Sequence, residues 1–287
     1  MTRLNFAECK EMKKIKRFNL GDASGAKKYF DENGFVIIEN AFDQNCLEVF
    51  NSELSEIIKA HIAKAGIDKD YNDDEIFDQA MMDLEAKDHE YIASIYDTIF
   101  QCPSFLRIIS KESVIDSVRS LMDKPNAPLY GYTNRCRIDP PKDDRRTYGW
   151  HQEVFYTIPK GNYLQTWAPL IRNTTIKNGT IQVAIGSHKE GIAKQSWNEI
   201  EGRATQILVD SEIVNKYEQV SVEMALGELL IFSGYLAHKS GTNLSDQYRY
   251  SLVGMYHDVS KLEFETPRLG FNYRGLTPRE FFESEMN

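Results

Sequence analysis

Along the first 125 residues, apolar side chains recur every three or four positions, which is the spacing of amphipathic helices. The clearest example begins after Asp43 and Asn45, either of which can cap a helix, and ends at Gly66. Its apolar positions are Leu47, Phe50, Leu54, Ile57, Ile58 and Ile62. Similar patterns predict helices over residues 92–101 and 112–122.

An apolar run at residues 35–38 follows Asn33-Gly34, so we expect a short buried strand that is entered through a turn. Residues 68–88, in contrast, are acidic. Their carboxylates include Asp70, Asp73, Asp74, Glu75 and Asp78. Because blocks of like charge usually serve solvation, we interpret this segment as a solvated surface face and not as a metal site.

From residue 128 onward the pattern changes to short apolar runs separated by Gly, Pro and Asn. Predicted strands cover residues 129–138, 163–171, 180–185, 205–209, 219–224, 228–232 and 248–256. Such closely spaced short strands indicate an antiparallel sandwich or barrel.

Neither a linker rich in Pro or Ser nor an internal repeat divides the 287 residues. We therefore expect a single domain over residues 1–287. In this arrangement residues 1–125 form a mainly helical jacket, residues 126–258 form the β core, and residues 259–287 form a C-terminal extension.

With 41% hydrophobic and 27% charged residues, the chain has the composition of an ordinary globular protein. Its net charge of −9 argues against nucleic acid or an anionic membrane as a partner. The widely separated Cys9, Cys46, Cys102 and Cys136 offer no zinc motif, so we interpret them as reduced thiols. Since no apolar stretch is long enough for a membrane span and the basic residues near the start are not followed by an apolar segment, we expect a cytoplasmic protein. The acidic charge favours a small molecule as its partner.

Candidate chemistry begins at His151, which is followed two residues later by Glu153. On an extended backbone these side chains point to the same face, so an imidazole and a carboxylate could supply two ligands to one metal ion. A second histidine from elsewhere would complete the arrangement of two histidines and one carboxylate that holds non-haem Fe(II). By itself, His-x-Glu is more often an ordinary surface or core pair.

Three later histidines could supply the third ligand: His188, His238 and His257. His238 follows an apolar strand and precedes Arg249 by eleven residues, and an arginine can grip a carboxylate with two parallel hydrogen bonds. His257 has Arg268 at the same offset, but Pro267 interrupts any strand there. We therefore prefer His238.

From about Tyr29 to Tyr256, the sequence resembles the phytanoyl-CoA dioxygenase family of Fe(II)- and 2-oxoglutarate-dependent oxygenases. The resemblance rests on several short segments in a fixed order. They are residues 31–38, Trp150-His151-Gln152-Glu153, Asn178-Gly179-Thr180, Gly186-Ser187-His188-Lys189, Gly227-Glu228, and His238 with Ser240, Asn243, Ser245 and Arg249. Together these segments are far more specific than any one of them.

The resemblance implies a mainly β fold, a double-stranded β-helix (a cupin-like jelly roll), with a helical N-terminal part and α-helices packed outside. It also implies that His151, Glu153 and His238 bind iron. The family usually has Asp where this chain has Glu153, which is one methylene longer and requires a small shift of the strand or the metal. A carboxylate at this position favours hydroxylation over halogenation.

For the cosubstrate 2-oxoglutarate, the resemblance implies that Arg249 and Ser240 hold the distal carboxylate and that Trp167 lines the pocket. A strand before the first metal pair commonly offers a polar side chain as well, for which Asn134 is the best candidate here. The alternative is that Arg137, on the opposite face of the same strand, points inward and meets an anionic or polyhydroxylated substrate. A surface or ion-paired position explains this arginine equally well.

Other residues near these positions have simpler explanations beside functional ones. Tyr156 and Gln152 are candidate substrate contacts, although core packing explains Tyr156 equally well. We expect His188 to be structural, His61 and His89 to face solvent, and Trp150 to pack near the metal pair.

The resulting hypothesis is a dioxygenase that uses Fe(II), 2-oxoglutarate and O2 to hydroxylate an unactivated C–H bond of a small polar metabolite, with succinate and CO2 as co-products. The same iron site could instead carry out desaturation, epimerisation or cyclisation. A jelly-roll binding protein without turnover is the alternative outside the enzymes.

Overall fold

The computed structural model describes residues 15–143, 147–157, 162–198 and 206–261. Several features named above lie outside these ranges. They are Cys9, Pro267 and Arg268, residue 205 of a predicted strand, and most of the expected C-terminal extension.

The first part of the chain is mainly helical, as predicted. Its elements are β1 (Arg17–Asn19), α1 (Ala23–Asn33), β2 (Phe35–Glu39), α2 (Gln44–Lys64), α3 (Gln79–Lys87), α4 (His89–Ile99), α5 (Pro103–Ile109) and α6 (Glu112–Leu121). The helix with the clearest sequence pattern is α2, and the Asp43 side chain caps it by accepting a hydrogen bond from the Cys46 backbone N–H at 2.8 Å. The periodicity did not reveal α1, in which only Ala26 and Phe30 are buried.

The second part is built of strands. They are β3 (Leu129–Asp139), β4 (Tyr163–Pro169), β5 (Ile181–Ala184), β6 (Gln195–Asn198), β7 (Gln206–Val209), β8 (Gln219–Ser221), β9 (Leu229–Ser233), β10 (His238–Ser240) and β11 (Arg249–Asp258). Short helical turns η1 (Glu153–Tyr156), η2 (Ser187–Glu190) and α7 (Ser211–Val214) lie between them. The predicted strand 219–224 ends early at Ser221, and Met224 instead forms an isolated bridge with Thr174.

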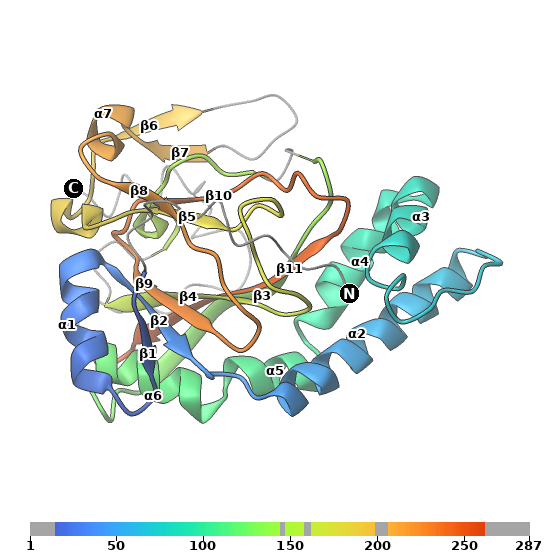
Figure 1. Ribbon diagram of the computed structural model, residues 1–287, viewed down its shortest axis with the longest axis horizontal. Coiled ribbons are helices and arrows are strands. Elements are labelled where there is room, and N and C mark those ends of the chain that lie inside the picture. Colours follow the sequence, from blue (N-terminus) through green and yellow to red (C-terminus); the bar gives the residue numbers. More distant parts are fainter. Residues whose placement is uncertain (1–14, 144–146, 158–161, 199–205, 262–287) are drawn as a thin grey trace, which may run out of the picture.

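The strands form two facing layers (Figure 1). A six-stranded sheet has the order β1-β2-β9-β4-β11-β3, and a three-stranded sheet has the order β10-β5-β8, while β6 and β7 pair separately. Helices α2, α5 and α6 cover the outer face of the larger sheet. This is the predicted jelly-roll core with flanking helices.

Strand β2 shows why the apolar run at residues 35–38 has no polar alternation. Val36 and Ile38 belong to the cluster that packs against the helices, whereas Phe35 and Ile37 belong to the cluster between the two sheets with Val183. Both faces of this strand are therefore buried, and all four side chains have to be apolar.

The acidic segment is mostly solvated as expected, but Asp78 is an exception. Its carboxylate accepts two hydrogen bonds of 2.8 Å from Arg172 and a third, also 2.8 Å, from the Tyr248 backbone N–H. Asp78 thus ties the segment before α3 to the start of β11. The expectation that it serves solvation was wrong, because charge density along the chain does not show which carboxylate meets a distant arginine.

His61 also differs from expectation. It is 5% exposed, and its two ring nitrogens lie within hydrogen-bonding distance of the Ile57 carbonyl and the Ser94 hydroxyl. His89 is exposed beside Glu85, as predicted.

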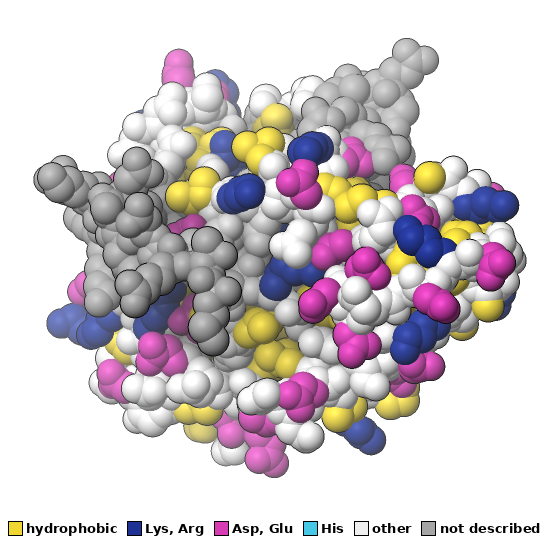
Figure 2. Space-filling view, turned by 45° about the vertical axis from the view of Figure 1, so that its right-hand side comes forward, with side chains coloured by type: hydrophobic (Ala, Val, Ile, Leu, Met, Phe, Trp, Pro, Cys, Tyr) yellow, Lys and Arg dark blue, Asp and Glu magenta, His cyan; other side chains and the backbone are white. Residues whose placement is uncertain are grey.

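On the face shown in Figure 2, acidic side chains are spread over the surface with lysines and arginines among them. None of the described helices combines the length and the apolar character that crossing a membrane requires.

Replacing Asp78 with alanine should destabilise the protein by about 3 kcal/mol, because Arg172 would lose its buried partner and the Tyr248 N–H its acceptor. Urea unfolding followed by circular dichroism measures this change. The matched control is Asp74→Ala at an exposed position of the same segment, which should change stability by less than about 0.5 kcal/mol. Equal effects of the two substitutions would contradict the proposed tie.

Candidate metal centre

Two histidines that are far apart in the sequence are joined through their backbones. The His151 N–H donates to the His238 carbonyl at 3.0 Å, and the His238 N–H donates to the His151 carbonyl at the same distance. This isolated antiparallel bridge connects the segment before η1 to the start of β10. It brings the two imidazole centroids to 4.2 Å.

Each imidazole is held by a second hydrogen bond on its Nδ1 atom. His151 Nδ1 lies 2.8 Å from the Gly149 carbonyl, and His238 Nδ1 lies 2.9 Å from the Leu236 carbonyl. Because a carbonyl only accepts hydrogen bonds, Nδ1 must carry the proton in both rings. The Nε2 lone pairs are therefore left available as metal ligands.

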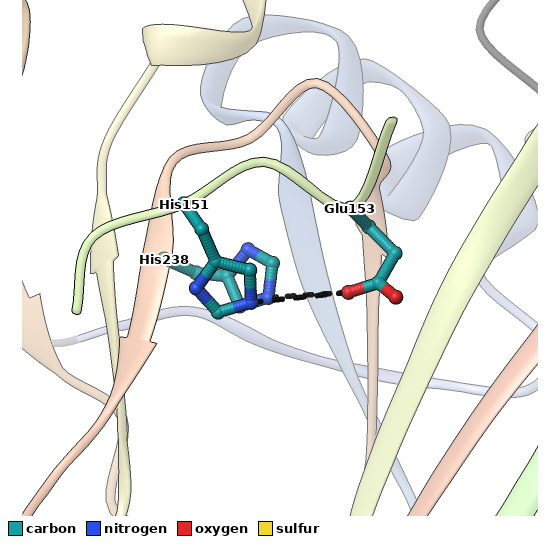
Figure 3. A group of neighbouring side chains, drawn as sticks. All are labelled: His151, Glu153 and His238. Carbon is teal, nitrogen blue, oxygen red and sulfur yellow. Dashed lines mark ion pairs between the residues drawn. The ribbon is translucent and has the colours of Figure 1, made fainter. Parts of the chain in front are cut away.

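Glu153 completes the group from the first residue of η1. Its Oε2 atom lies 3.9 Å from the Nε2 atoms of both His151 and His238. All three side chains point toward one another (Figure 3). Their potential ligand atoms lie within 4.8 Å of one another, which makes this the metal-ligating group found in the described part of the chain.

The electrostatics of this group fit a divalent cation. Burial lowers the pKa of His151 to about 4 and the pKa of His238 well below its usual value, so both rings are neutral at physiological pH. Burial raises the pKa of Glu153 to about 7, against the opposing effects of the Arg135 charge and a hydrogen bond from Gln165. A carboxylate that is costly to bury, placed opposite two neutral nitrogen donors, is the donor set expected for Fe(II).

A cluster of charges lies on β3 and β11 beside this group. The Asp139 carboxylate accepts hydrogen bonds from Arg137 Nε at 2.8 and 3.0 Å and forms an ion pair with Arg249 Nη2 at 2.8 Å. Arg249 is 2% exposed, and its Nη1 also donates to the carbonyls of Asn178 and Gly241. The buried Arg249 and the partly buried Arg137 thus share one carboxylate, which leaves an excess positive charge for an incoming anion.

The segment Asn178-Gly179-Thr180 has a steric role in this cluster. Gly179 has a φ of +78°, and a Cβ atom there would lie 2.7 Å from Arg249 Nη1 and 2.5 Å from the Gly241 carbonyl oxygen. Only glycine permits this backbone conformation together with so close an approach of the guanidinium.

Two other residues predicted to bind the cosubstrate lie on strands β10 and β4. Ser240 follows His238 by two positions in β10 and so shares its face. Trp167 is 6% exposed in β4, where it pairs with Leu230 and Val253 and packs in the cluster between the sheets.

The side chain of Asn134, which was predicted to contact the cosubstrate, lies on the face of β3 opposite to the metal group. It lies in a bulge where the register of β3 against β11 shifts, and its Oδ1 accepts a hydrogen bond from the Met255 N–H at 3.2 Å. Its side chain approaches Gly254, whose neighbours Leu252 and Tyr256 belong to the cluster that packs against the helices. The alternation of side chains along β3 does not show by itself which face is inward, so it could not reveal that Arg135 and Arg137 point inward.

The side chain of Gln152, a predicted substrate contact, is bound within the protein. The side chain is fully buried, and its amide donates to the carbonyls of Gly191 and Tyr235 and accepts from the Ala193 N–H. All of these bonds go to the backbone, so Gln152 fastens the segment that carries the metal group.

The ring of Tyr156 lies beside the metal group. Its ring stands edge-on to the His151 ring at 5.9 Å, and its hydroxyl accepts a hydrogen bond of 2.7 Å from the Ile207 N–H. The hydroxyl therefore anchors β7.

The competing histidines lie elsewhere. His257 is buried against Tyr163, with its Nε2 3.3 Å from the Thr157 hydroxyl. His188 lies beside Gly34, with its Nε2 3.2 Å from the Asp31 carbonyl, which is a structural position.

Sequence reasoning missed two residues of the site, Gln165 and Asp139. Gln165 hydrogen-bonds the Glu153 carboxylate from β4, and Asp139 holds the two arginines. Asp139 follows Arg135 and Arg137 at alternate positions of one strand, a signal that the sequence does contain.

Metal affinity should depend on pH through Glu153. Between pH 5 and 7 both imidazoles are already neutral, whereas Glu153 holds a proton that a metal ion has to displace. Affinity for Mn(II) should therefore fall about tenfold per pH unit below pH 7 and level off above it. Calorimetric titration of the metal-free protein measures this slope.

Glu153→Gln is the control for that titration, because it removes the titrating group while preserving the shape of the side chain. The variant should bind Mn(II) more weakly, with an affinity that changes little between pH 5 and 7. A wild-type affinity that is constant over this range would contradict the assignment.

The model of the phytanoyl-CoA dioxygenase (PhyH) family matches residues 30–251. A 1-deoxypentalenic acid 11-beta-hydroxylase from Streptomyces arenae is 24% identical over 267 residues, which cover 90% of this chain and 87% of the relative.

Solved structures share the fold. The epimerase SnoN, in complex with Fe3+, alpha ketoglutarate and nogalamycin RO, aligns with a TM-score of 0.58 and 12% identity over 87% of this chain and 92% of its own. The carbocyclase SnoK aligns with a TM-score of 0.55 and 17% identity over 85% of this chain and 87% of its own.

Proposed function

This chain belongs to the phytanoyl-CoA dioxygenase family of Fe(II)- and 2-oxoglutarate-dependent oxygenases, and from this membership we propose its reaction and the residues that carry it. The protein is an oxidoreductase that acts on a small molecule. The proposed reaction is hydroxylation of an unactivated C–H bond of a small polar metabolite, with succinate and CO2 as co-products. The observation that carries the proposal is the buried Glu153 carboxylate opposite two Nε2 donors of neutral histidines.

In the proposed site, His151, Glu153 and His238 would hold the iron. When bound, Fe(II) with 2-oxoglutarate supplies the oxidising chemistry that these side chains lack, the coupling of O2 reduction to C–H hydroxylation. The carbonyls at Gly149 and Leu236 hold both rings in the tautomer that presents Nε2. Gln165 fixes the orientation of the Glu153 carboxylate.

Arg249 and Ser240 are proposed to bind the distal carboxylate of 2-oxoglutarate. The Arg249 guanidinium is already ordered by Asp139 and two carbonyls, so it does not have to lose side-chain entropy when the cosubstrate binds. Its Nε atom is buried and has no hydrogen-bond partner among the described residues. Trp167 and the apolar cluster around it exclude water from this end of the site.

Hydroxylation is preferred among the possible outcomes because the hydroxylase relative aligns over nearly the whole chain. The fold itself does not choose, since epimerase and carbocyclase structures share it. We place the reaction in the cytoplasm, without nucleic acid or membrane partners. Free thiols at Cys46, Cys102 and Cys136 support that location.

The iron ligands can be tested by the visible charge-transfer band that forms when Fe(II) and 2-oxoglutarate are added under anaerobic conditions. His238→Ala should abolish the band, because it removes one Nε2 donor from the site. His257→Ala is the matched control and should leave the band unchanged, because His257 lies against Tyr163 away from the ligands. The reverse result would identify His257 as the third ligand, and a wild-type protein without the band would refute the oxygenase.

The cosubstrate site can be tested with Arg249→Gln. The variant should require at least about tenfold more 2-oxoglutarate for half-maximal release of succinate, since a charge-assisted bidentate contact would be lost. Its affinity for Mn(II) should stay within about twofold of wild type, because Arg249 does not contact the ligands. Arg107→Gln removes an exposed arginine of α5 and serves as control. An unchanged requirement for 2-oxoglutarate would exclude Arg249 from this role.

A further inference from the structure

We infer that Arg135 binds an anionic group of the organic substrate, and that this group is a carboxylate. The inference rests on the proposed function, because it concerns the molecule oxidised at the same site. The Arg135 guanidinium faces the site, and no role in binding the metal or the cosubstrate has been assigned to it.

The register of β3 against β11 sets the direction of this side chain. Arg135 pairs with Val253, two positions before Arg137, which pairs with Ser251. Asp139, two positions further, pairs with Arg249. Residues at alternate positions of a strand share a face, so Arg135 lies on the inward face that carries the buried charge cluster.

Arg135 is not neutralised by a carboxylate of the described residues. It forms no ion pair with Glu153 within 4.0 Å, whereas Arg137 Nε lies 2.8 Å from an oxygen of Asp139.

The hydrogen bonds of Arg135 are also incomplete. Among the residues that the structure describes, its partner is the Thr133 carbonyl, which accepts from Nε at 3.3 Å. A guanidinium has five N–H donors arranged to match a carboxylate. Its terminal amino groups are therefore available for a ligand on the inner side of the sheet.

The sum of charges around the site points to the same ligand. Arg135, Arg137, Arg249 and a divalent ion outweigh Asp139 and Glu153 by three positive charges. The two carboxylates of 2-oxoglutarate compensate two of these charges. Among the described residues one positive charge then remains, and a negatively charged group of the substrate would compensate it.

The test uses monocarboxylic acids, aliphatic and aromatic, each beside its own primary amide. The two members of a pair have nearly the same shape and differ in charge. Binding is measured as the shift in melting temperature of the protein loaded with Mn(II) and 2-oxoglutarate in the absence of O2. Stimulation of succinate release by the Fe(II)-loaded protein is measured in parallel.

We expect acids of the set to bind wild type at least about tenfold more tightly than their amides. Arg135→Gln should reduce this preference to within about twofold. Arg135→Lys should retain part of the preference, because lysine keeps the positive charge but lacks the paired N–H donors of the guanidinium. Arg107→Gln removes one positive charge far from the site and should retain the full preference.

Equal binding of acids and amides to wild type would overturn the inference, as would an acid set in which no member binds. A full acid preference in Arg135→Gln would also overturn it. If Arg135→Gln instead loses Mn(II) affinity, the residue acts through Glu153 and the inference fails. Failure of the proposed function is distinguishable, because the wild-type protein would then show neither the charge-transfer band nor succinate, whatever its preference for acids.

Discussion

The site depends on one pair of backbone hydrogen bonds, those between His151 and His238. This bridge sets the position of the segment that carries His151 and Glu153 relative to β10. The bridge alone does not suffice, because an imidazole can still turn about its own side-chain bonds. The carbonyls of Gly149 and Leu236 remove that freedom and choose the tautomer. The buried amide of Gln152 adds three further bonds that hold the same segment.

The second constraint is the cost of burying charge on the inner side of the sheet. The Asp139 carboxylate compensates the positive charges of both Arg137 and Arg249. Gly179 leaves room for the Arg249 guanidinium, because it has no side chain. A second buried carboxylate, that of Asp78, lies at the same start of β11, where it accepts hydrogen bonds from Arg172 and from the backbone N–H of Tyr248. The start of β11, which carries Arg249, is thus held by two buried carboxylates.

Much of the architecture could be predicted from local patterns. The apolar periodicity of α2 and its cap at Asp43 can be read from neighbouring residues. The same is true of the apolar run of β2, which is buried on both faces, and of the succession of short strands after residue 128. Helix α1 could not be predicted from the sequence pattern, because it buries few side chains and its apolar periodicity is weak. The burial of His61 could not be predicted either, because its partner Ser94 lies on another helix.

For the site, the sequence by itself determined which residues are chemically competent: a histidine and a carboxylate two positions apart, a later histidine after an apolar strand, and an arginine beyond it. Only the tertiary structure decided which way each side chain points. A bulge turns Asn134 toward the helices and leaves Arg135 and Arg137 facing inward, and the bond from Gln165 to Glu153 joins two strands that no local pattern relates. The physical reason is that residue type and spacing act along the chain, whereas register, burial and charge compensation depend on neighbours that are distant in sequence.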